Sequence, residues 1–191
     1  MSKKNKGRVG ETRAIRVIAD IMDVEGNVDF TRHTNTNTAD GGADIVLEHP
    51  QGFIDKFERI ADQIDTEPTS QNGVDLESTK LTNSAPSELK NNTEKTRIDV
   101  KNTERKLGKD TVIKFGGDIR KNPDCKNHVL MGGSDLTKGA KDELISLQNA
   151  HSTSGKKILH VNNTGLTNIE SHYKSLNVDG NESNSKPSET K

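Results

Sequence analysis

Apolar residues recur at helical spacing near the start of the chain. Ile15, Ile18 and Met22 fall on one side of a 3.6-residue period, which predicts a helix from about residue 9 to residue 23. Glu11 lies one turn before Ile15 on this apolar side, so we expect it to face the interior. An acid in the first turn also interacts favourably with the helix dipole, and position alone does not separate the two explanations.

Two strands are predicted before residue 50. Weak alternation of apolar and polar residues indicates an edge strand over 27–33, and an apolar run indicates a strand over 43–48. In the second strand Ile45 and Leu47 share one face, and Asp44 lies on the other. Two glycines precede Asp44, and an Asp in that position is more often a turn residue than a ligand.

The stretch 96–102 (Thr-Arg-Ile-Asp-Val-Lys-Asn) is the most unusual strand that the pattern predicts. Ile98 and Val100 point to one face, whereas Asp99 and Lys101 point to the other. Burying a carboxylate and an ammonium costs free energy unless both meet partners or a metal ion. Taken alone, the pair is more typical of an ordinary ion pair on an exposed sheet face.

Between these two strands the chain changes character. An amphipathic helix is predicted from residue 53 to residue 64, and residues 61–96 contain only seven hydrophobic residues in thirty-six. Such sequence rarely joins a packed core, so we interpret 51–95 as a polar insertion, partly disordered, within a hairpin of two core strands. A long surface loop adds only modest closure entropy, so the two strands can still pair.

The second half of the chain alternates helices and strands. The periodicity predicts, in order, a helix over 111–121, a strand over 127–131, a helix over 138–150 with Thr137 as its N-cap, and a strand over 157–161. His128 and His160 lie in these apolar strands, and we interpret them as satisfied sheet residues rather than ligands. Residues 167–191, rich in Ser, Asn, Lys and Glu, are interpreted as a disordered tail.

The order of these elements predicts the class of fold. A helix comes first, followed by three strands that can form an antiparallel meander, and then by two crossover units. This order is typical of an α/β protein with a mixed central sheet flanked by helices.

The length indicates one domain, and the composition indicates that part of the chain does not join its packed core. Of the 191 residues, 28% are hydrophobic and 3% are aromatic, which is low for a fully packed domain of this length. Cys125 is the single cysteine, which excludes an intrachain disulfide and a Cys-rich zinc site. Because no apolar run has membrane-spanning length and no apolar leader is visible, we expect an intracellular protein, cytoplasmic or, in a eukaryotic host, nuclear.

The net charge of −1 conceals a local asymmetry. Residues 1–20, which begin with a basic arm over 1–7, carry six basic and two acidic side chains, and 97–121 carry eight and four. Residues 55–96 carry five basic and nine acidic side chains. Basic segments suit a polyanion, although a single charge run is more often a solvated surface. The candidate phosphate contacts are Arg8, Arg32, Lys109, Lys114 and Lys138.

An ordered set of three acids and one lysine resembles the pattern of the PD-(D/E)xK nuclease superfamily. Members of this family carry an acid on the first helix, an Asp that opens the second strand and (Asp/Glu)-x-Lys on the third. The matching residues are Glu11 in Gly-Arg-Val-Gly-Glu, Asp44 in Gly-Gly-Ala-Asp, and Asp99-Val100-Lys101. The resemblance implies the restriction-endonuclease-like fold, with an αβββαβ core.

The stretch that follows His128 indicates which members of this superfamily the chain resembles most. It runs Val-Leu-Met-Gly-Gly-Ser-Asp-Leu-Thr-Lys-Gly-Ala, which is similar to the strand, turn and helix start after the active site in Mrr-like restriction endonucleases. The resemblance covers roughly residues 8–50 and 96–166. The connection between Asp44 and Asp99 is longer than is usual in the family, and Asp99 stands where Glu is the commoner residue.

The resemblance implies a metal-dependent endonuclease that hydrolyses DNA phosphodiester bonds in the restriction or junction-resolving style. Asp44, Asp99 and the Val100 carbonyl would hold Mg²⁺ or Mn²⁺, for which hard oxygen ligands are suited. Glu11 would hold a second metal or a metal-bound water. Lys101 would orient or deprotonate the attacking water and stabilise the developing charge on phosphorus. Cutting both strands implies a homodimer.

Two other classes of function remain open from the sequence. The first is a non-catalytic module on the same fold, which binds nucleic acid or a protein through its basic surface. The second is a partner-binding protein whose acidic segment 55–96 is the working surface. The intact Asp99 and Lys101 pair favours the nuclease over the first alternative.

Overall fold

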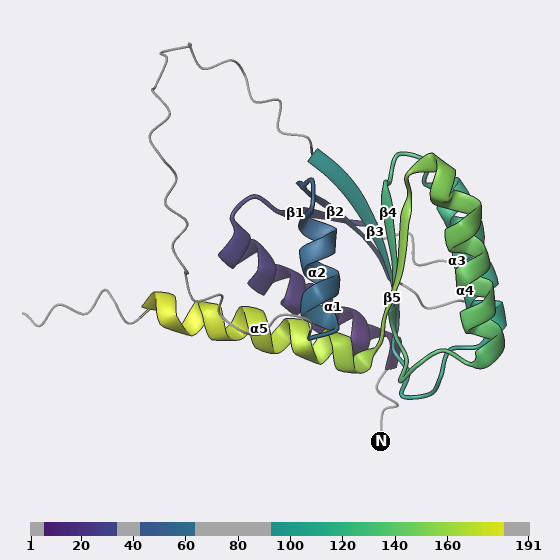
Figure 1. Ribbon diagram of the computed structural model, residues 1–191. Helices are drawn as coiled ribbons and strands as arrows, with labels where there is room; N and C mark the ends of the chain where they lie inside the picture. The colour runs from purple at the N-terminus through teal and green to yellow at the C-terminus, as the bar shows by residue number, and fades with distance from the viewer. Residues whose placement is uncertain (1–5, 34–42, 64–92, 182–191) are drawn as a thin grey trace, which may run out of the picture.

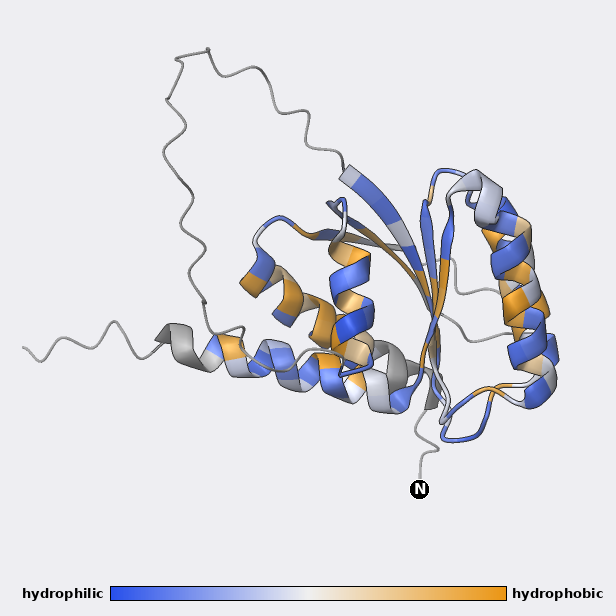
Figure 2. Ribbon diagram, viewed as in Figure 1, coloured by the Kyte–Doolittle hydropathy of each residue, from blue (hydrophilic) through white to orange (hydrophobic). Residues whose placement is uncertain are grey.

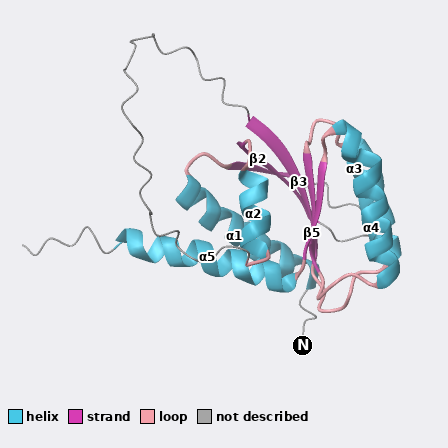
Figure 3. Ribbon diagram, in the orientation of Figure 1, coloured by secondary structure: helices cyan, strands magenta, loops and turns pink. Residues whose placement is uncertain are grey.

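The chain folds into a five-stranded mixed sheet between two layers of helices (Figures 1 and 3). The computed structural model describes the backbone of residues 6–33, 43–63 and 93–181, and the side chains of 12–31, 45–63 and 93–177. The elements in order are α1 (Lys6–Glu25), β1 (Asp29–His33), β2 (Ala43–Pro50), α2 (Phe53–Ala61), β3 (Thr93–Lys101), α3 (Lys109–Lys121), β4 (Asn127–Gly132), α4 (Lys138–His151), the 3-10 turn η1 (Ser152–Ser154), β5 (Lys157–Val161) and α5 (Asn163–Asn181).

The strands lie side by side in chain order. β1 pairs with β2 and β2 with β3 in antiparallel fashion, whereas β3, β4 and β5 are parallel neighbours. The predicted α/β class, the meander and the two crossover units are therefore confirmed. Thr137 also caps α4 as predicted, because its side chain accepts a hydrogen bond from the Ala140 N–H.

Two predicted boundaries are wrong. β3 begins at Thr93, so the first three residues of this strand belong to the sheet and not to the insertion. The extension is held by an ion pair between Lys95 and Glu48 at 3.1 Å. Residues 64–92 of the predicted insertion lie outside the described part of the chain. So do residues 1–5 of the basic arm predicted over 1–7, and its last two residues belong to α1.

The larger correction concerns the predicted tail at 167–191, because the chain is helical as far as Asn181. Leu166, Ile169 and Tyr173 are buried on one side of α5, at spacings of three and four residues. The Tyr173 hydroxyl donates to a Glu25 carboxylate oxygen at 2.8 Å, which ties α5 to α1. Three apolar residues in a polar segment are a weak sequence signal, and the helix is stabilised by tertiary packing that the sequence does not display.

The two faces of the sheet are covered by different helices. Helices α1, α2 and α5 pack on one face, where Ile98 and Val100 of β3 join the larger apolar core. Helices α3 and α4 cover the other face, against Leu130 and Ile158. Figure 2 shows apolar residues gathered where the helices meet the sheet. None of the described helices has the length and apolar content that a bilayer-spanning segment needs.

The loops that follow β3 and β4 are bound together at one end of the sheet. Gly132 has φ of +116° and Gly133 has φ of +72°, conformations that L side chains rarely adopt. A Cβ on Gly132 would lie 2.0 Å from the Lys101 carbonyl oxygen. The turn after β4 can therefore approach the end of β3 only because it has no side chain at this position.

We expect Gly132→Ala to lower the free energy of unfolding by more than about 1 kcal/mol, because it adds both backbone strain and a clash. Gly117→Ala is the matched control: this glycine lies inside α3 and has no neighbour within 4 Å of an added Cβ. We expect the control to raise stability by about 0.5–1 kcal/mol, as Gly to Ala does in a helix interior. Urea unfolding of both variants measures the difference, and equal stability of Gly132→Ala and wild type would contradict the argument.

Candidate active site

Asp99 and Lys101 form an ion pair near the end of β3. Lys101 Nζ lies 2.9 Å from Asp99 Oδ1, and the Asp99 side chain is only 4% exposed against 22% for Lys101. Both side chains are on the sheet face that α3 and α4 cover, because alternate residues of β3 enter the opposite core. Among the described residues, Asp99 Oδ1 is contacted by the Lys101 ammonium and accepts no further hydrogen bond of standard geometry. A carboxylate oxygen has a second lone pair, which can accept a further cation.

The register of β2 on β3 places Asp44 directly opposite Asp99. Directly opposed positions of an antiparallel pair are the nearest cross-strand neighbours, and like charges there are destabilising. The side chain of Asp44 lies outside the described residues. The backbone alone therefore brings together two positions, 55 residues apart in the sequence, that both carry an acid.

Val100 lies between Asp99 and Lys101 and faces the other way. Its side chain is buried in the larger apolar core, and in the sheet it is paired with Ala43 on one side and Met131 on the other. This packing fixes the peptide between the two charged residues. Ligation of a metal by the Val100 carbonyl stays a prediction.

Glu11 lies in α1, which packs on the opposite face of the sheet from Asp99 and Lys101. The buried stripe of this helix runs through Ala14, Ile18 and Ile21, and position 11 continues it by one turn. The side chain of Glu11 lies outside the described residues. Its contribution to a metal centre would require α1 to reach the end of the sheet, and it stays a prediction.

Among the described side chains, no three His, Cys, Asp or Glu residues are grouped as a metal site requires. Two of the predicted ligands, Glu11 and Asp44, are not among those side chains, so the complete predicted set is not represented. The donor chemistry of the set fits Mg²⁺ or Mn²⁺, because all of the ligands are oxygen atoms. Asp99 Oδ1, which is buried and paired with Lys101, is one such oxygen.

A small pocket lies just past the end of β3. It is lined by Asn102, Thr103, Glu104 and Arg105, the residues that directly follow Lys101. Asn163, at the start of α5, donates to the Thr103 carbonyl at 3.0 Å and to a Glu104 carboxylate oxygen at 3.2 Å. The sequence pattern assigned no functional role to these four residues. Their position immediately after the Asp-x-Lys motif was the available signal.

Of the five predicted phosphate contacts, three have described side chains and two do not. Lys109 and Lys138 are the first residues of α3 and α4, and both are exposed. Lys114 is exposed further along α3. Arg8 lies in α1 and Arg32 in β1, and their side chains are outside the described residues.

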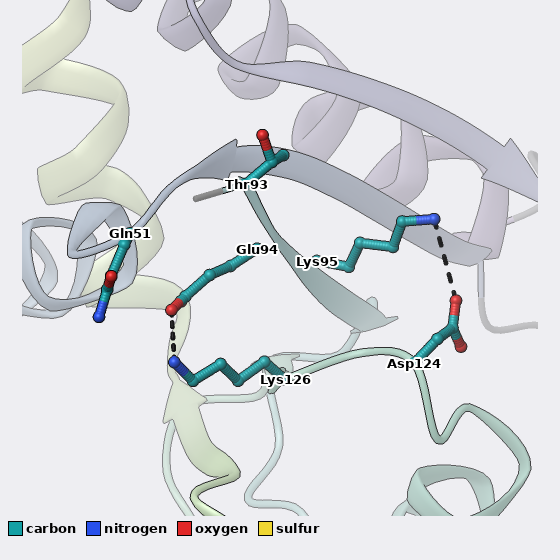
Figure 4. A pocket seen from close by; sticks show the side chains of 6 residues that line it. All are labelled: Gln51, Thr93, Glu94, Lys95, Asp124 and Lys126. Carbon is teal, nitrogen blue, oxygen red and sulfur yellow. Dashed lines mark hydrogen bonds and ion pairs between the residues drawn. The ribbon is translucent and has the colours of Figure 1, made fainter. Parts of the chain in front are cut away.

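A larger pocket lies at the other end of the sheet, where β3 begins (Figure 4). Its charged lining is paired internally: Lys126 contacts Glu94 at 2.5 Å, and Lys95 lies 3.9 Å from Asp124. Because each ammonium there has its own carboxylate, this pocket offers little net charge to a ligand. We therefore locate the candidate site at the end of β3.

The buried histidines are neutral near pH 7. Burial lowers the pKa of His160, whose Nε2–H donates to the Gly132 carbonyl at 2.9 Å. Burial, together with the cationic Lys156 and Arg97, lowers the pKa of His128 to about 4. The Cys125 backbone opposes this shift in part, yet neither ring nitrogen of His128 makes a hydrogen bond of standard geometry with the described residues.

Both histidines lie in strands as predicted, and His160 has a hydrogen-bond partner. For His128 the Cys125 backbone is a partner only outside standard geometry. A buried imidazole with so weak a partner carries a desolvation cost, which is smallest for the neutral form.

Comparisons with family models, with curated proteins and with solved structures found no match for this chain.

We expect His128 to make the protein acid-sensitive. The unfolded chain binds the proton near pH 6.5 and the folded chain only near pH 4. Stability is therefore complete above pH 6.5 and falls as the pH is lowered from 6.5 to 4, by about 3 kcal/mol for this group. We expect His128→Leu to remove this contribution to the pH dependence of the unfolding free energy. Burial also lowers the pKa values of His49 and His160, so the variant keeps the smaller acid sensitivity that these two residues cause. Urea unfolding at several pH values measures it, and an unchanged slope in the variant would refute the assignment.

Proposed function

We propose that this protein is a metal-dependent endonuclease that hydrolyses DNA phosphodiester bonds. The proposed centre consists of Asp44, Asp99, Lys101 and Glu11, with Mg²⁺ or Mn²⁺ held by the carboxylates and the Val100 carbonyl. The observation that carries the proposal is the β2–β3 register, which sets Asp44 opposite Asp99 with Lys101 next to them.

Electrostatics favours a cation at this position. Two carboxylates at opposed positions repel each other, and Asp99 is almost completely removed from water. Lys101 offsets part of this charge through its ion pair. A divalent cation between the two acids would offset the rest. Such an ion, when bound, would also neutralise negative charge on the phosphate and lower the pKa of a bound water.

Lys101 has the placement that the proposed reaction needs. Its Nζ is fixed by Asp99 at 2.9 Å, while the side chain keeps access to solvent. The amine can therefore contact a water or a phosphate oxygen at the surface without leaving its partner. In the proposed reaction it orients the attacking water and stabilises the negative charge that develops on the phosphate oxygens.

An ordinary ion pair on the same two strands provides a contrast. Glu48 of β2 and Lys95 of β3 are directly opposite each other, with a contact of 3.1 Å. Both are well exposed, at 47% and 42% of their side chains, and such pairs cost little to form. Asp99 is buried at a desolvation cost that this exposed pair avoids, and a functional requirement explains why that cost is retained.

We expect Asp44→Asn, Asp99→Asn and Lys101→Ala each to lower Mg²⁺-dependent nicking of supercoiled plasmid by at least about 100-fold. Each change removes a proposed metal ligand or the amine. Glu48→Gln and Lys95→Ala are the matched controls, because they alter the same two strands at the other end of the sheet. The controls retain wild-type activity, and circular dichroism verifies that all five variants fold.

Three results would oppose the proposal. Nicking by wild type that persists in excess EDTA would exclude the metal. Equal losses in the controls and the site variants would exclude the specific role of the site. Binding of DNA by wild type without cleavage of DNA or RNA would favour the non-catalytic module instead.

Two coordinated cuts per binding event, measured as linear product, would support a homodimer.

A further inference from the structure

Both helices on the Asp99 face begin at the end of the sheet where Lys101 lies. β3 and β4 are parallel and each is followed by a helix that runs back, so α3 and α4 start at the same end. A Cβ on Gly139 would lie 3.9 Å from Lys109 Cβ, which places the two helix starts side by side. The side chains at these starts are therefore neighbours of the candidate site.

Two lysines from different elements meet at one carboxylate there. Lys141 Nζ of α4 lies 2.9 Å from Asp135 Oδ2, and Lys106 Nζ of the β3–α3 loop lies 3.6 Å from the same oxygen. The contact from Lys141, the Leu136 N–H and the charge of Lys106 lower the pKa of Asp135 to about 2. Both lysines remain more than half exposed, so two ammonium groups share one carboxylate and face solvent.

Backbone hydrogen bonds hold the two lysines in register. The Leu107 N–H donates to the Asp135 carbonyl at 2.8 Å, and the Thr137 N–H donates to the Leu107 carbonyl at 2.9 Å. The Ser134 N–H donates to the Arg105 carbonyl at 3.2 Å. The loop that carries Lys106 is thus fixed to the loop that precedes α4. A site that is fixed before binding loses less conformational entropy when a ligand binds.

The chain between Lys101 and Lys106 lines the small pocket at the end of β3. Along the chain, Lys101 is followed by the pocket residues Asn102 to Arg105 and then by Lys106, which meets Lys141 at Asp135. We expect a nucleic-acid strand that follows this stretch to place one phosphate at Lys101 and a neighbouring phosphate at the two lysines. Glu104 and Asp142 are exposed carboxylates in this region, so we expect a local contact and not a broad polyanion surface.

We propose that Lys106 and Lys141 form a clamp that binds a backbone phosphate of DNA adjacent to the phosphate at Lys101. The clamp rests on the proposed function for its substrate, and it adds a contact that neither the motif nor the family pattern contains. It reads charge and not base identity, because an ammonium contact to a phosphate carries no sequence information. The two lysines together neutralise one phosphate, and the clamp therefore adds the salt dependence of one phosphate contact.

The test is equilibrium binding of a fluorescently labelled 30-base-pair duplex, measured by anisotropy in EDTA so that no cleavage occurs. We expect the Lys106→Ala/Lys141→Ala double variant to bind roughly tenfold more weakly, with a slope of log K against log salt reduced by about 0.9. The Lys106→Arg/Lys141→Arg double variant keeps the wild-type slope, because the charges remain.

The matched control is Lys121→Ala/Lys126→Ala. These lysines are also exposed and also pair with carboxylates, those of Asp118 and Glu94, but they lie at the other end of the sheet. The control loses the same charge and is expected to keep the wild-type slope. Equal weakening in both double variants, weakening in the control alone, or no binding by wild type would overturn the clamp.

The two proposals fail in different experiments. Clamp-dependent binding without Mg²⁺-dependent cleavage would retain the clamp and remove the nuclease. Cleavage that depends on Asp99 but binding that is indifferent to Lys106 and Lys141 would retain the nuclease and remove the clamp.

Discussion

The pairing of β2 with β3 is the constraint on which the rest of the structure depends. Eight residue pairs, from Ala43 opposite Val100 to Pro50 opposite Thr93, fix one register between two segments that are far apart in the sequence. Because side chains alternate between faces, a slip of one residue would move Asp99 into the apolar core and Ile98 out of it. The apolar face of β3 therefore enforces the position of the charged face.

The two faces of β3 have different roles. Ile98 and Val100 join the core under α1, α2 and α5, and this burial supplies the stabilisation of the central strand. Arg97, Asp99 and Lys101 lie on the opposite face, where Arg97 contacts Asp118 at 3.5 Å and Asp99 contacts Lys101. A row of three charged residues on a central strand costs desolvation free energy, which the apolar face must offset. This distribution is expected where a sheet carries a chemical site.

The end of the sheet is built to hold this site in place. Gly132 allows β4 to pass close to the Lys101 carbonyl, and His160 donates to the Gly132 carbonyl from the next strand. The hydrogen bonds between Leu107 and its partners then join the two following loops. In parallel sheets, the carboxyl ends of the strands are the usual place for ligands, because loops and helix starts converge there. The candidate site and the proposed phosphate clamp both lie at such an end.

The sequence by itself determined where most of the helices and strands of this protein form. Alternation in β3, the apolar run of β4 and the stripe of α4 predicted elements that the structure contains, because burial of one face leaves a local pattern in the chain. The order of Asp44, Asp99 and Lys101 on consecutive strands was likewise readable, since an antiparallel meander brings the start of one strand to the end of the next.

Only the tertiary structure decided which distant residues meet. The helix α5 forms because α1 and α2 offer an apolar surface on which Leu166, Ile169 and Tyr173 pack. The local sequence of α5 does not indicate that this surface exists. The same holds for Lys106 and Lys141, which are joined through Asp135, and for the burial of His128. Local sequence encodes which face of an element is apolar, whereas contacts between elements depend on the geometry of the whole sheet.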